Sequence, residues 1–268
     1  MIHDRNKLKL IFIDILRGYS VRSLHKNNIF IKHQTSFDSG DIDHKKEEFK
    51  NKAIIRGLPT LDDQEKYIIK EKLWSEEKNK EIEKIILYIS NLKTTKSKLF
   101  RNEEIKAINV RIHEEILKLN KLQSEKKELI GFTAEDYALK KINEYHIKNS
   151  LFREESLTYK YFSETQFDEL EDEDIVNILN IYDNFNKDFI EKNLKKIALS
   201  SFYLNLFNIS EDNPYYFYGK PIIYLTFYQI EIFGYARYFK SIISNAKNKP
   251  SDDLYEDPDK LIDWVGKF

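Results

Sequence analysis

The fold is decided by residues 75–131, which read SEEKNKEIEKIILYISNLKTTKSKLFRNEEIKAINVRIHEEILKLNKLQSEKKELIG. Apolar residues recur in this stretch at intervals of three and four. The first series is Ile82, Ile85, Ile89, Leu92 and Leu99, and the second is Ile105, Ile108, Ile112, Ile116, Leu119, Leu122 and Leu129. This spacing places each series on one face of an α-helix. Glu and Lys cover the other faces, as is usual for solvated helices.

The two predicted helices are joined by a short break at Phe100-Arg101-Asn102. Asn102 is the expected N-cap of the second helix, and Gly131 is the expected residue at its end. Each helix has about 25 residues and is roughly 37 Å long. A short connection between two apolar stripes predicts an antiparallel hairpin with coiled-coil-like packing.

Composition supports a mainly α protein. The chain has 268 residues with only 7 Gly and 5 Pro, so tight turns are few. We therefore expect three segments: a small α/β segment with a β-hairpin over 1–57, the helical hairpin over 58–130, and an aromatic-rich C-terminal helical domain over 131–268.

The N-terminal segment begins with an apolar run over residues 5–17, which predicts a buried short helix or a strand ended by Gly18. Residues 19–34 predict a β-hairpin with a turn at Lys26-Asn27-Asn28, since Asn tolerates left-handed backbone. Residues 35–46 are interpreted as a polar loop.

Capping signals mark the remaining helices. Thr60 and Thr133 are expected N-caps, and capping boxes are expected at Ser163 with Gln166 and at Thr226 with Gln229. Asp257 before Pro258 predicts a last short helix ended by Gly266. Helices are expected near 134–151, 164–170, 173–193, 194–208, 227–246 and 258–265.

The sequence argues against an enzyme and against a cofactor. With no cysteine, thiolate chemistry and cysteine-ligated zinc are excluded. No two glycines lie within ten residues of each other, so a phosphate-binding glycine loop is not expected. His3, His25, His33 and His44 near Asp38, Asp41 and Asp43 match no metal-ligand spacing. The acidic cluster at 169–174 is explained by a helix N-terminus. No apolar run is long enough to span a membrane.

An alternative function is nucleic-acid association. Residues 1–60 carry 12 basic and 7 acidic side chains, a net charge of +5. The basic residues of the N-terminal part include Lys7, Lys9, Arg17, Arg22, Lys26 and Lys32. Phosphate contacts need such charge on one face, although no recognition motif accompanies it.

Aromatic residues dominate the C-terminal half, where residues 182–239 contain seventeen Phe and Tyr. The favoured interpretation is that they form the core of the C-terminal domain, and the alternative is that they form an exposed protein-binding surface. Two partner-binding sites are expected, at the hairpin tip and at a loop over 215–221 stiffened by Pro214 and Pro221. The residues are Leu99, Phe100 and Arg101 at the tip, and Tyr215, Tyr216, Phe217, Tyr218 and Lys220 in the loop.

The segment NPYYFYGKPI (213–222), followed by LTFYQIEIFGYARYF (225–239) and DPDKLIDW (257–264), resembles tail or baseplate-hub assembly proteins of contractile-tailed bacteriophages. Residues 131–151, GFTAEDYALKKINEYHIKNSL, give the same resemblance. It covers about the C-terminal half and contains no catalytic motif. The resemblance implies action in the host cytoplasm or in the virion.

Taken together, these features predict a non-enzymatic structural or assembly protein that presents helical surfaces to protein partners. The resemblance implies that the partners are virion components, or copies of the chain itself. Nucleic acid is the less favoured partner.

Overall fold

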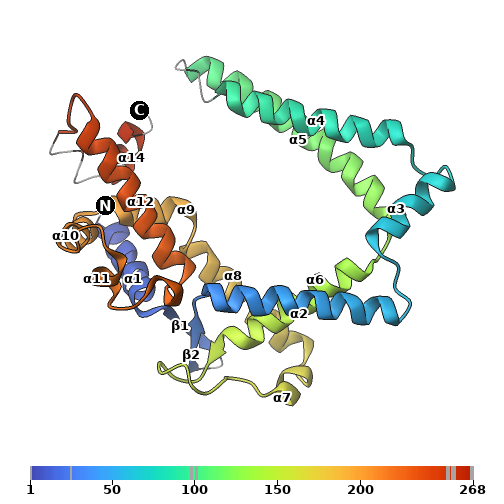
Figure 1. Cartoon of the computed structure of the whole chain (residues 1–268), viewed down its shortest axis with the longest axis horizontal. Coiled ribbons are helices and arrows are strands. Elements are labelled where there is room, and N and C mark those ends of the chain that lie inside the picture. The colour runs from blue at the N-terminus through green and yellow to red at the C-terminus, as the bar shows by residue number, and fades with distance from the viewer. Residues whose placement is uncertain are drawn as a thin grey trace. The chain divides into compact units, whose positions relative to one another are not determined.

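The computed structural model describes residues 2–24, 26–96, 99, 102–251, 254 and 258–265. The chain is mainly α-helical, with one small antiparallel sheet near the N-terminus, as the sequence predicted (Figure 1). It forms two compact units. Unit 1 comprises residues 1–45 and 143–268, and unit 2 comprises residues 46–142.

The unit boundaries differ from the three predicted segments, 1–57, 58–130 and 131–268. The divisions after residues 45 and 142 fall inside two long helices, α2 (Ser36–Ile55) and α6 (Ala134–Ser150). Turn residues in the sequence mark where helices end, but they do not mark where a compact unit ends.

The helical hairpin in unit 2 is confirmed. Helices α4 (Glu76–Lys96) and α5 (Asn102–Ile130) lie side by side and antiparallel (Figure 1). Lys78 of α4 forms an ion pair of 3.3 Å with Glu125 of α5, which marks the register of the two helices. The predicted stripe of α4 faces the seam, where its buried residues are Ile85, Ile89 and Leu92.

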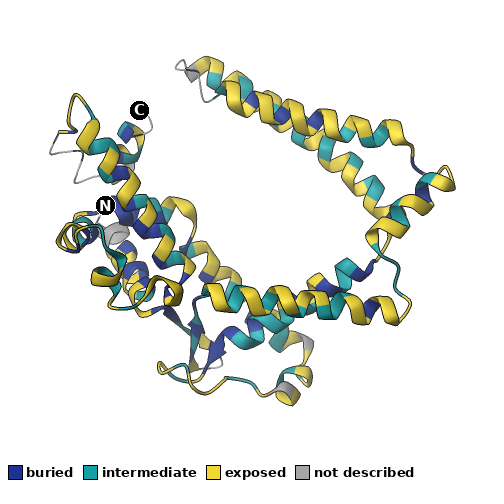
Figure 2. Cartoon of the chain, in the orientation of Figure 1, coloured by how far each residue is buried: buried dark blue, intermediate teal, exposed yellow. Residues whose placement is uncertain are grey.

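The stripe of α5 is only half-buried along the same seam. Figure 2 shows how little of this hairpin is buried. Its half-buried residues are Ile105, Ile108, Ile112, Ile116, Leu119 and Leu122. Two helices packed only on each other leave the outer side of each stripe in contact with water.

A small core lies at the end of the hairpin away from the connection between α4 and α5. Ile68 of α3 (Leu61–Lys70), Trp74 and Ile130 are buried together. Thr60 caps α3 by accepting a hydrogen bond from the Asp63 amide, as expected. Gly131 ends α5 with a left-handed φ of 73°, and its N–H donates to the Lys127 carbonyl at 3.0 Å.

The prediction of a polar loop over 35–46 is wrong, because α2 begins at Ser36. The Thr35 amide donates to the Asp38 carboxylate at 2.8 Å, and the Asp38 amide donates back to Thr35 Oγ1 at 3.5 Å. This reciprocal pair is a helix start, with Asp in place of the usual Glu or Gln. Gly40 within the helix costs only about 1 kcal/mol relative to alanine and does not break it.

Unit 1 is built on a helix and a β-hairpin. The apolar run forms α1 (Ile2–Arg17), and Gly18 ends it with a φ of 79°. β1 (Tyr19–Leu24) pairs antiparallel with β2 (Asn27–Lys32), and β2 pairs with the short β3 (Leu151–Phe152).

The turn of this β-hairpin lies earlier than predicted. Leu24 pairs with Asn27, so Asn27 and Asn28 belong to β2, and Lys26 takes the left-handed conformation with a φ of 68°. Two residues are enough for a hairpin turn. His25 lies outside the described residues.

The C-terminal helices differ from the prediction at two breaks. The expected helix over 173–193 ends at Asp188, and the one over 194–208 divides at Ser200. The region contains, in order, α7 (Glu164–Asp168), α8 (Asp172–Asp188), α9 (Glu191–Leu199), α10 (Ser201–Ile209), α11 (Pro214–Tyr218), η1 (Ile222–Tyr224), α12 (Phe227–Asn245) and α14 (Pro258–Val265). The expected caps Asp257 and Gly266 lie outside the described residues.

The core of unit 1 joins these helices to the β-hairpin. α9 and α12 contribute Leu194, Ile197 and Ile232, and α1 contributes Ile15. Aromatic side chains fill much of the remaining volume, as the core interpretation of the aromatic residues predicted. The buried or nearly buried rings are Phe12, Phe185, Phe189, Tyr203, Phe207, Phe233 and Phe239.

Candidate protein-interaction surface

The segment predicted as a loop over 215–221 begins as a short helix, α11, and then turns sharply. Asn213 Oδ1 accepts from the Tyr215 amide at 2.9 Å, and Pro214 occupies the first helical position. Gly219 is left-handed with a φ of 67°, and its N–H donates to the Tyr215 carbonyl at 2.8 Å. This region is therefore held by its own backbone bonds.

The next residues lead into α12 through the predicted capping box. Thr226 Oγ1 accepts from the Gln229 amide at 3.2 Å, and Gln229 Oε1 accepts from the Thr226 amide at 3.0 Å. The Gln229 side chain is fully buried, and its Nε2 donates to the carbonyl oxygens of Ile15 and Leu16 at 2.8 and 3.2 Å. One side chain thus caps α12 and ties it to the end of α1.

Two of the predicted partner-binding residues pack against the core. The Phe217 ring lies 5.0 Å from the Tyr203 ring and 5.8 Å from the Phe233 ring. The Tyr218 hydroxyl donates to the Gln229 carbonyl at 3.0 Å, and burial raises the pKa of Tyr218 well above its usual value. These rings anchor the segment and leave only part of their surface to solvent.

Other apolar side chains of the same segment face water. Tyr216 is 69% exposed and Ile222 is 62% exposed, whereas Leu225 between them and α12 is 1% exposed. Phe37 at the start of α2 stacks on Tyr224 with ring centroids 5.6 Å apart. We define the 215–230 surface as Tyr215, Tyr216, Ile222, Ile223, Tyr224, Phe227, Ile230 and Phe37, all of them exposed.

Lys220 lies half-buried within this segment, where burial lowers the pKa of its ammonium group. It is the one charged side chain among residues 213–230. The surface therefore offers apolar contact area with little charge, which suits protein partners better than phosphates.

The structure describes less of the hairpin tip. Leu99 is half-buried, whereas Phe100 and Arg101 lie outside the described residues. Partner binding at Leu99, Phe100 and Arg101 stays a prediction.

The sequence did not predict that a group of polar side chains is buried together in unit 1. His33 Nε2 lies 3.0 Å from Ser20 Oγ, and its ring packs among Phe185, Phe189 and Tyr228. Burial, with a smaller effect of Arg22, lowers the pKa of His33 to about 3, so the imidazole is neutral at pH 7. His33 contributes to packing rather than to charge.

His146 is the second member of this group. Its Nε2 lies 2.5 Å from the Tyr182 hydroxyl, and burial lowers its pKa. Both histidines line a cavity of about 260 Å³ together with Lys32, Gln34 and Asn186. No carboxylate is among the described residues that line this cavity, whereas Asp38 and Asp41 line a second pocket together with His146. Within the described residues, no three His, Asp or Glu side chains are grouped as metal ligands.

The basic N-terminal residues are partly neutralised by carboxylates. Lys7 and Arg22 both pair with Asp188 at 2.9 Å, and Lys32 pairs with Asp38 at 2.6 Å. These pairs reduce the charge that this part of the chain offers to a phosphate backbone. In the part of the chain that the structure describes, no helix is both long and apolar enough to cross a bilayer.

Comparison with known proteins found no family model, no curated protein and no solved structure that matches this chain. The class of protein is therefore defined by its own fold and surface. It is a mainly α protein that combines a long two-helix hairpin with an exposed aromatic and aliphatic surface.

Proposed function

We propose that this chain is a non-enzymatic assembly protein that binds another protein through the 215–230 surface. The observation that carries the proposal is the contrast within one segment. The segment is anchored to the core by Phe217, Tyr218 and Leu225. In the same segment, the side chains of Tyr216, Ile222 and Tyr224 are exposed to solvent. Large apolar side chains that a rigid backbone keeps exposed are characteristic of binding surfaces.

The rigidity of the segment favours binding energetically. The Gly219 turn, the Thr226–Gln229 capping box and the Tyr218 hydroxyl bond hold the backbone before any partner arrives. Binding therefore does not have to order this segment, and more of the contact energy remains as affinity. The aromatic side chains themselves lose little conformational entropy when they are covered.

The resemblance to tail and baseplate-hub assembly proteins supports virion assembly as the process and virion proteins as the partners. The same segment, 213–239, carries both the resemblance and the exposed surface. We place this action in the host cytoplasm or in the virion.

The test compares two double variants. Ile222→Ser with Tyr224→Ser removes two apolar side chains from the surface. Ile209→Ser with Tyr238→Ser removes a pair of the same residue types elsewhere in unit 1, which is at least as exposed. A partner is first identified in cells that produce the protein, with a cross-linking group placed within residues 215–230. Its affinity for each purified variant is then measured by calorimetry.

We expect the first variant to bind about tenfold or more weakly, and the second within about threefold of the wild type. Exposed substitutions should leave the free energy of unfolding within about 0.5 kcal/mol of the wild type, which urea titration checks. Equal affinities for both variants, or the absence of any partner cross-linked at residues 215–230, would refute the proposal.

A further inference from the structure

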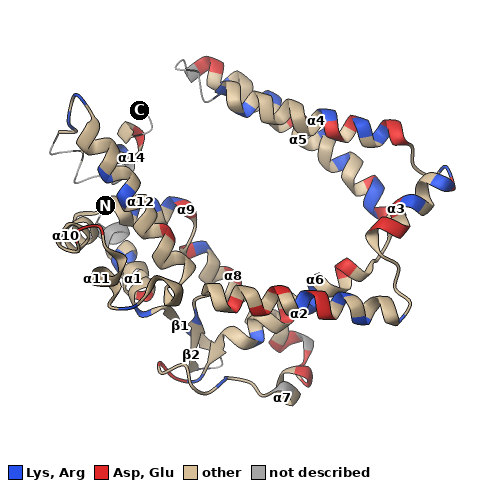
Figure 3. Ribbon diagram, viewed as in Figure 1, with Lys and Arg blue, Asp and Glu red and all other residues tan. Residues whose placement is uncertain are grey.

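The cavity of about 260 Å³ that His33 and His146 line lies at the edge of the 215–230 surface. Phe227 belongs to both, since it is a member of that surface and one of the lining residues. The segment that leads to this edge, from α11 to the start of α12, is almost free of charge (Figure 3). A protein that covers Phe227 therefore also reaches the cavity.

The cavity has a buried inner end and an exposed rim. Its inner residues His33 and Phe185 are 1% and 2% exposed, whereas Phe227 and Asn186 are exposed. Six of the described lining residues carry rings, namely His33, His146, Tyr182, Phe185, Phe227 and Tyr228. The volume lies below the roughly 300–1,000 Å³ of pockets for drug-sized ligands, so it suits one aromatic side chain.

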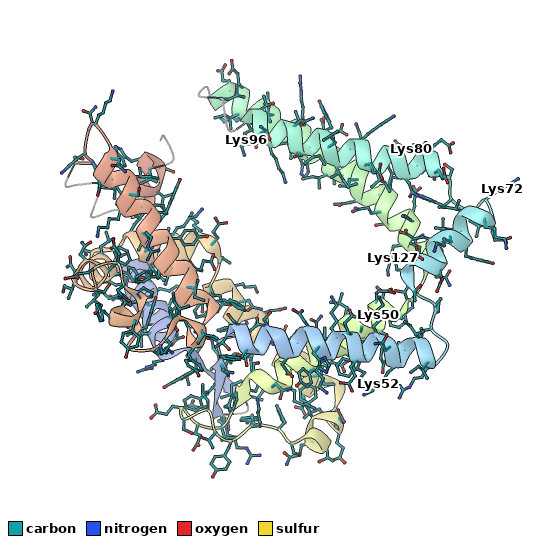
Figure 4. The ribbon with its side chains drawn as sticks, viewed as in Figure 1. Lys50, Lys52, Lys72, Lys80, Lys96 and Lys127 are labelled. Carbon is teal, nitrogen blue, oxygen red and sulfur yellow. The ribbon has the colours of Figure 1, made fainter. Side chains whose placement is uncertain are left out.

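The charge of this cavity is close to balanced. Lys32 is the one charged side chain among the described lining residues, and its ammonium group pairs with Asp38 at 2.6 Å. Lys80 of α4, by contrast, projects into solvent (Figure 4). Burial lowers the pKa of His33 to about 3 and also lowers the pKa of His146, so both rings are neutral at pH 7. The cavity therefore favours a neutral guest over an ionised one.

One polar atom of the His33 ring has no partner. Burial raises the pKa of Asp14, and a hydrogen bond from the Ser20 hydroxyl opposes this rise. Because a hydroxyl has one hydrogen, Ser20 Oγ accepts the hydrogen bond of 3.0 Å from His33 Nε2. Nδ1 is then an acceptor without a proton, and it is buried with no hydrogen-bond partner among the described residues. A guest that brings a donor to this atom gains a hydrogen bond that the free protein lacks.

We infer that the protein partner inserts a tryptophan side chain into this cavity, past Phe227, and that the indole N–H donates to Nδ1 of His33. This inference rests on the proposed function and adds the identity of the side chain that the partner contributes. Tryptophan is among the residues that contribute most to protein interfaces, where such residues fill well-packed pockets.

Other guests match the cavity less well. Phenylalanine and aliphatic side chains suit its rings but bring no donor to His33. Tyrosine brings a donor together with an oxygen acceptor that needs a partner of its own, whereas indole is a donor only. A nucleotide brings phosphates, and the ammonium group of Lys32 is already paired with Asp38.

The first experiment uses the full chain without a partner, so that it tests the cavity by itself. N-acetyl-tryptophanamide is titrated into the labelled protein and followed by two-dimensional NMR of the backbone amides. We expect saturation with a Kd on the order of 1 mM, and shifts at amides near His33, Phe185 and Tyr228. N-acetyl-phenylalaninamide and the N-methylindole analogue should bind about five- to tenfold more weakly, because neither carries the donor.

Three results of this titration would overturn the inference. They are the absence of saturation below about 10 mM, shifts confined to other parts of the chain, and equal binding of the N–H and N-methyl probes. Adenosine serves as a further probe, and tighter binding of adenosine than of N-acetyl-tryptophanamide would show a nucleoside site instead.

The second experiment removes the acceptor and keeps a ring in its place. His33→Phe should bring the affinities for the N–H and N-methyl probes within about twofold of each other. The control His113→Phe, at an exposed histidine of α5, should keep the preference of the wild type. Circular dichroism checks that both variants keep their helix content. A preference that persists in His33→Phe would mean that the methyl group is too large for the cavity, and would overturn the role of Nδ1.

The cavity and the surface can fail separately. Ile222→Ser with Tyr224→Ser changes no lining residue and should leave the affinity for N-acetyl-tryptophanamide within about twofold of the wild type. In the complex, His33→Phe and replacement of the inserted tryptophan by phenylalanine should each weaken binding about fivefold or more, and the two losses should not add. A partner that binds through the surface without an inserted tryptophan would overturn this inference and leave the proposed function standing.

Discussion

At the residue scale, Gln229 links the candidate surface to the core. Its amide completes the N-terminus of α12 and donates to two carbonyl oxygens at the end of α1. Removing this fully buried side chain takes one hydrogen bond from each carbonyl oxygen, although the Ile15 oxygen also accepts from the Gly18 amide at 3.2 Å. Tyr224 and Phe227 precede Gln229 in the chain, and their placement at the surface depends on this anchor.

Gln229→Ala should lower the free energy of unfolding by about 2–4 kcal/mol, because it removes both a cap and buried hydrogen bonds. Gln166 occupies the same position in the exposed capping box of α7, so Gln166→Ala should cost only about 0.5–1 kcal/mol. Urea unfolding of both variants gives the comparison. Equal losses would mean that the contacts with Ile15 and Leu16 contribute nothing.

At the element scale, a glycine that follows a helix and a glycine inside a helix act in opposite ways. Gly131 ends α5 in the left-handed conformation, whereas Gly40 lies inside α2 with nothing within 4 Å of an added Cβ. Only the first position requires a residue without a side chain. At Gly40, glycine brings only the conformational-entropy cost that it has inside any helix.

Gly131→Ala should therefore destabilise the protein by about 1 kcal/mol or more, and Gly40→Ala should stabilise it by roughly 0.5–1 kcal/mol. Thermal unfolding followed by circular dichroism measures both variants against the wild type. A stabilising Gly131→Ala substitution would contradict the role of this residue as the end of the helix.

At the scale of the whole molecule, the two units have separate cores. Unit 1 packs around α1, α9 and α12, while the small core of unit 2 contains Ile68, Trp74 and Ile130. The loosely buried hairpin of unit 2 is expected to exchange its amide hydrogens faster than the core of unit 1, since few of its apolar contacts are fully buried.

Ile232→Ala removes a fully buried side chain from unit 1 and should lower its stability by about 3 kcal/mol. Hydrogen exchange read by mass spectrometry should show loss of protection in peptides from α9 and α12, with the α4 and α5 peptides nearly unchanged. Loss of protection to the same extent in α4 would show that the two units unfold as one.

The amino-acid sequence alone determined the helical class, the α4–α5 hairpin and most helix starts, because these follow from residues three to seven positions apart. Only the tertiary structure decided which aromatic residues face inward. Tyr216 and Phe217 are neighbours, yet one is exposed and the other packs on Tyr203 and Phe233. The buried amide of Gln229 reaches a carbonyl 214 residues away. Such contacts depend on the packing of distant elements, which no local spacing encodes.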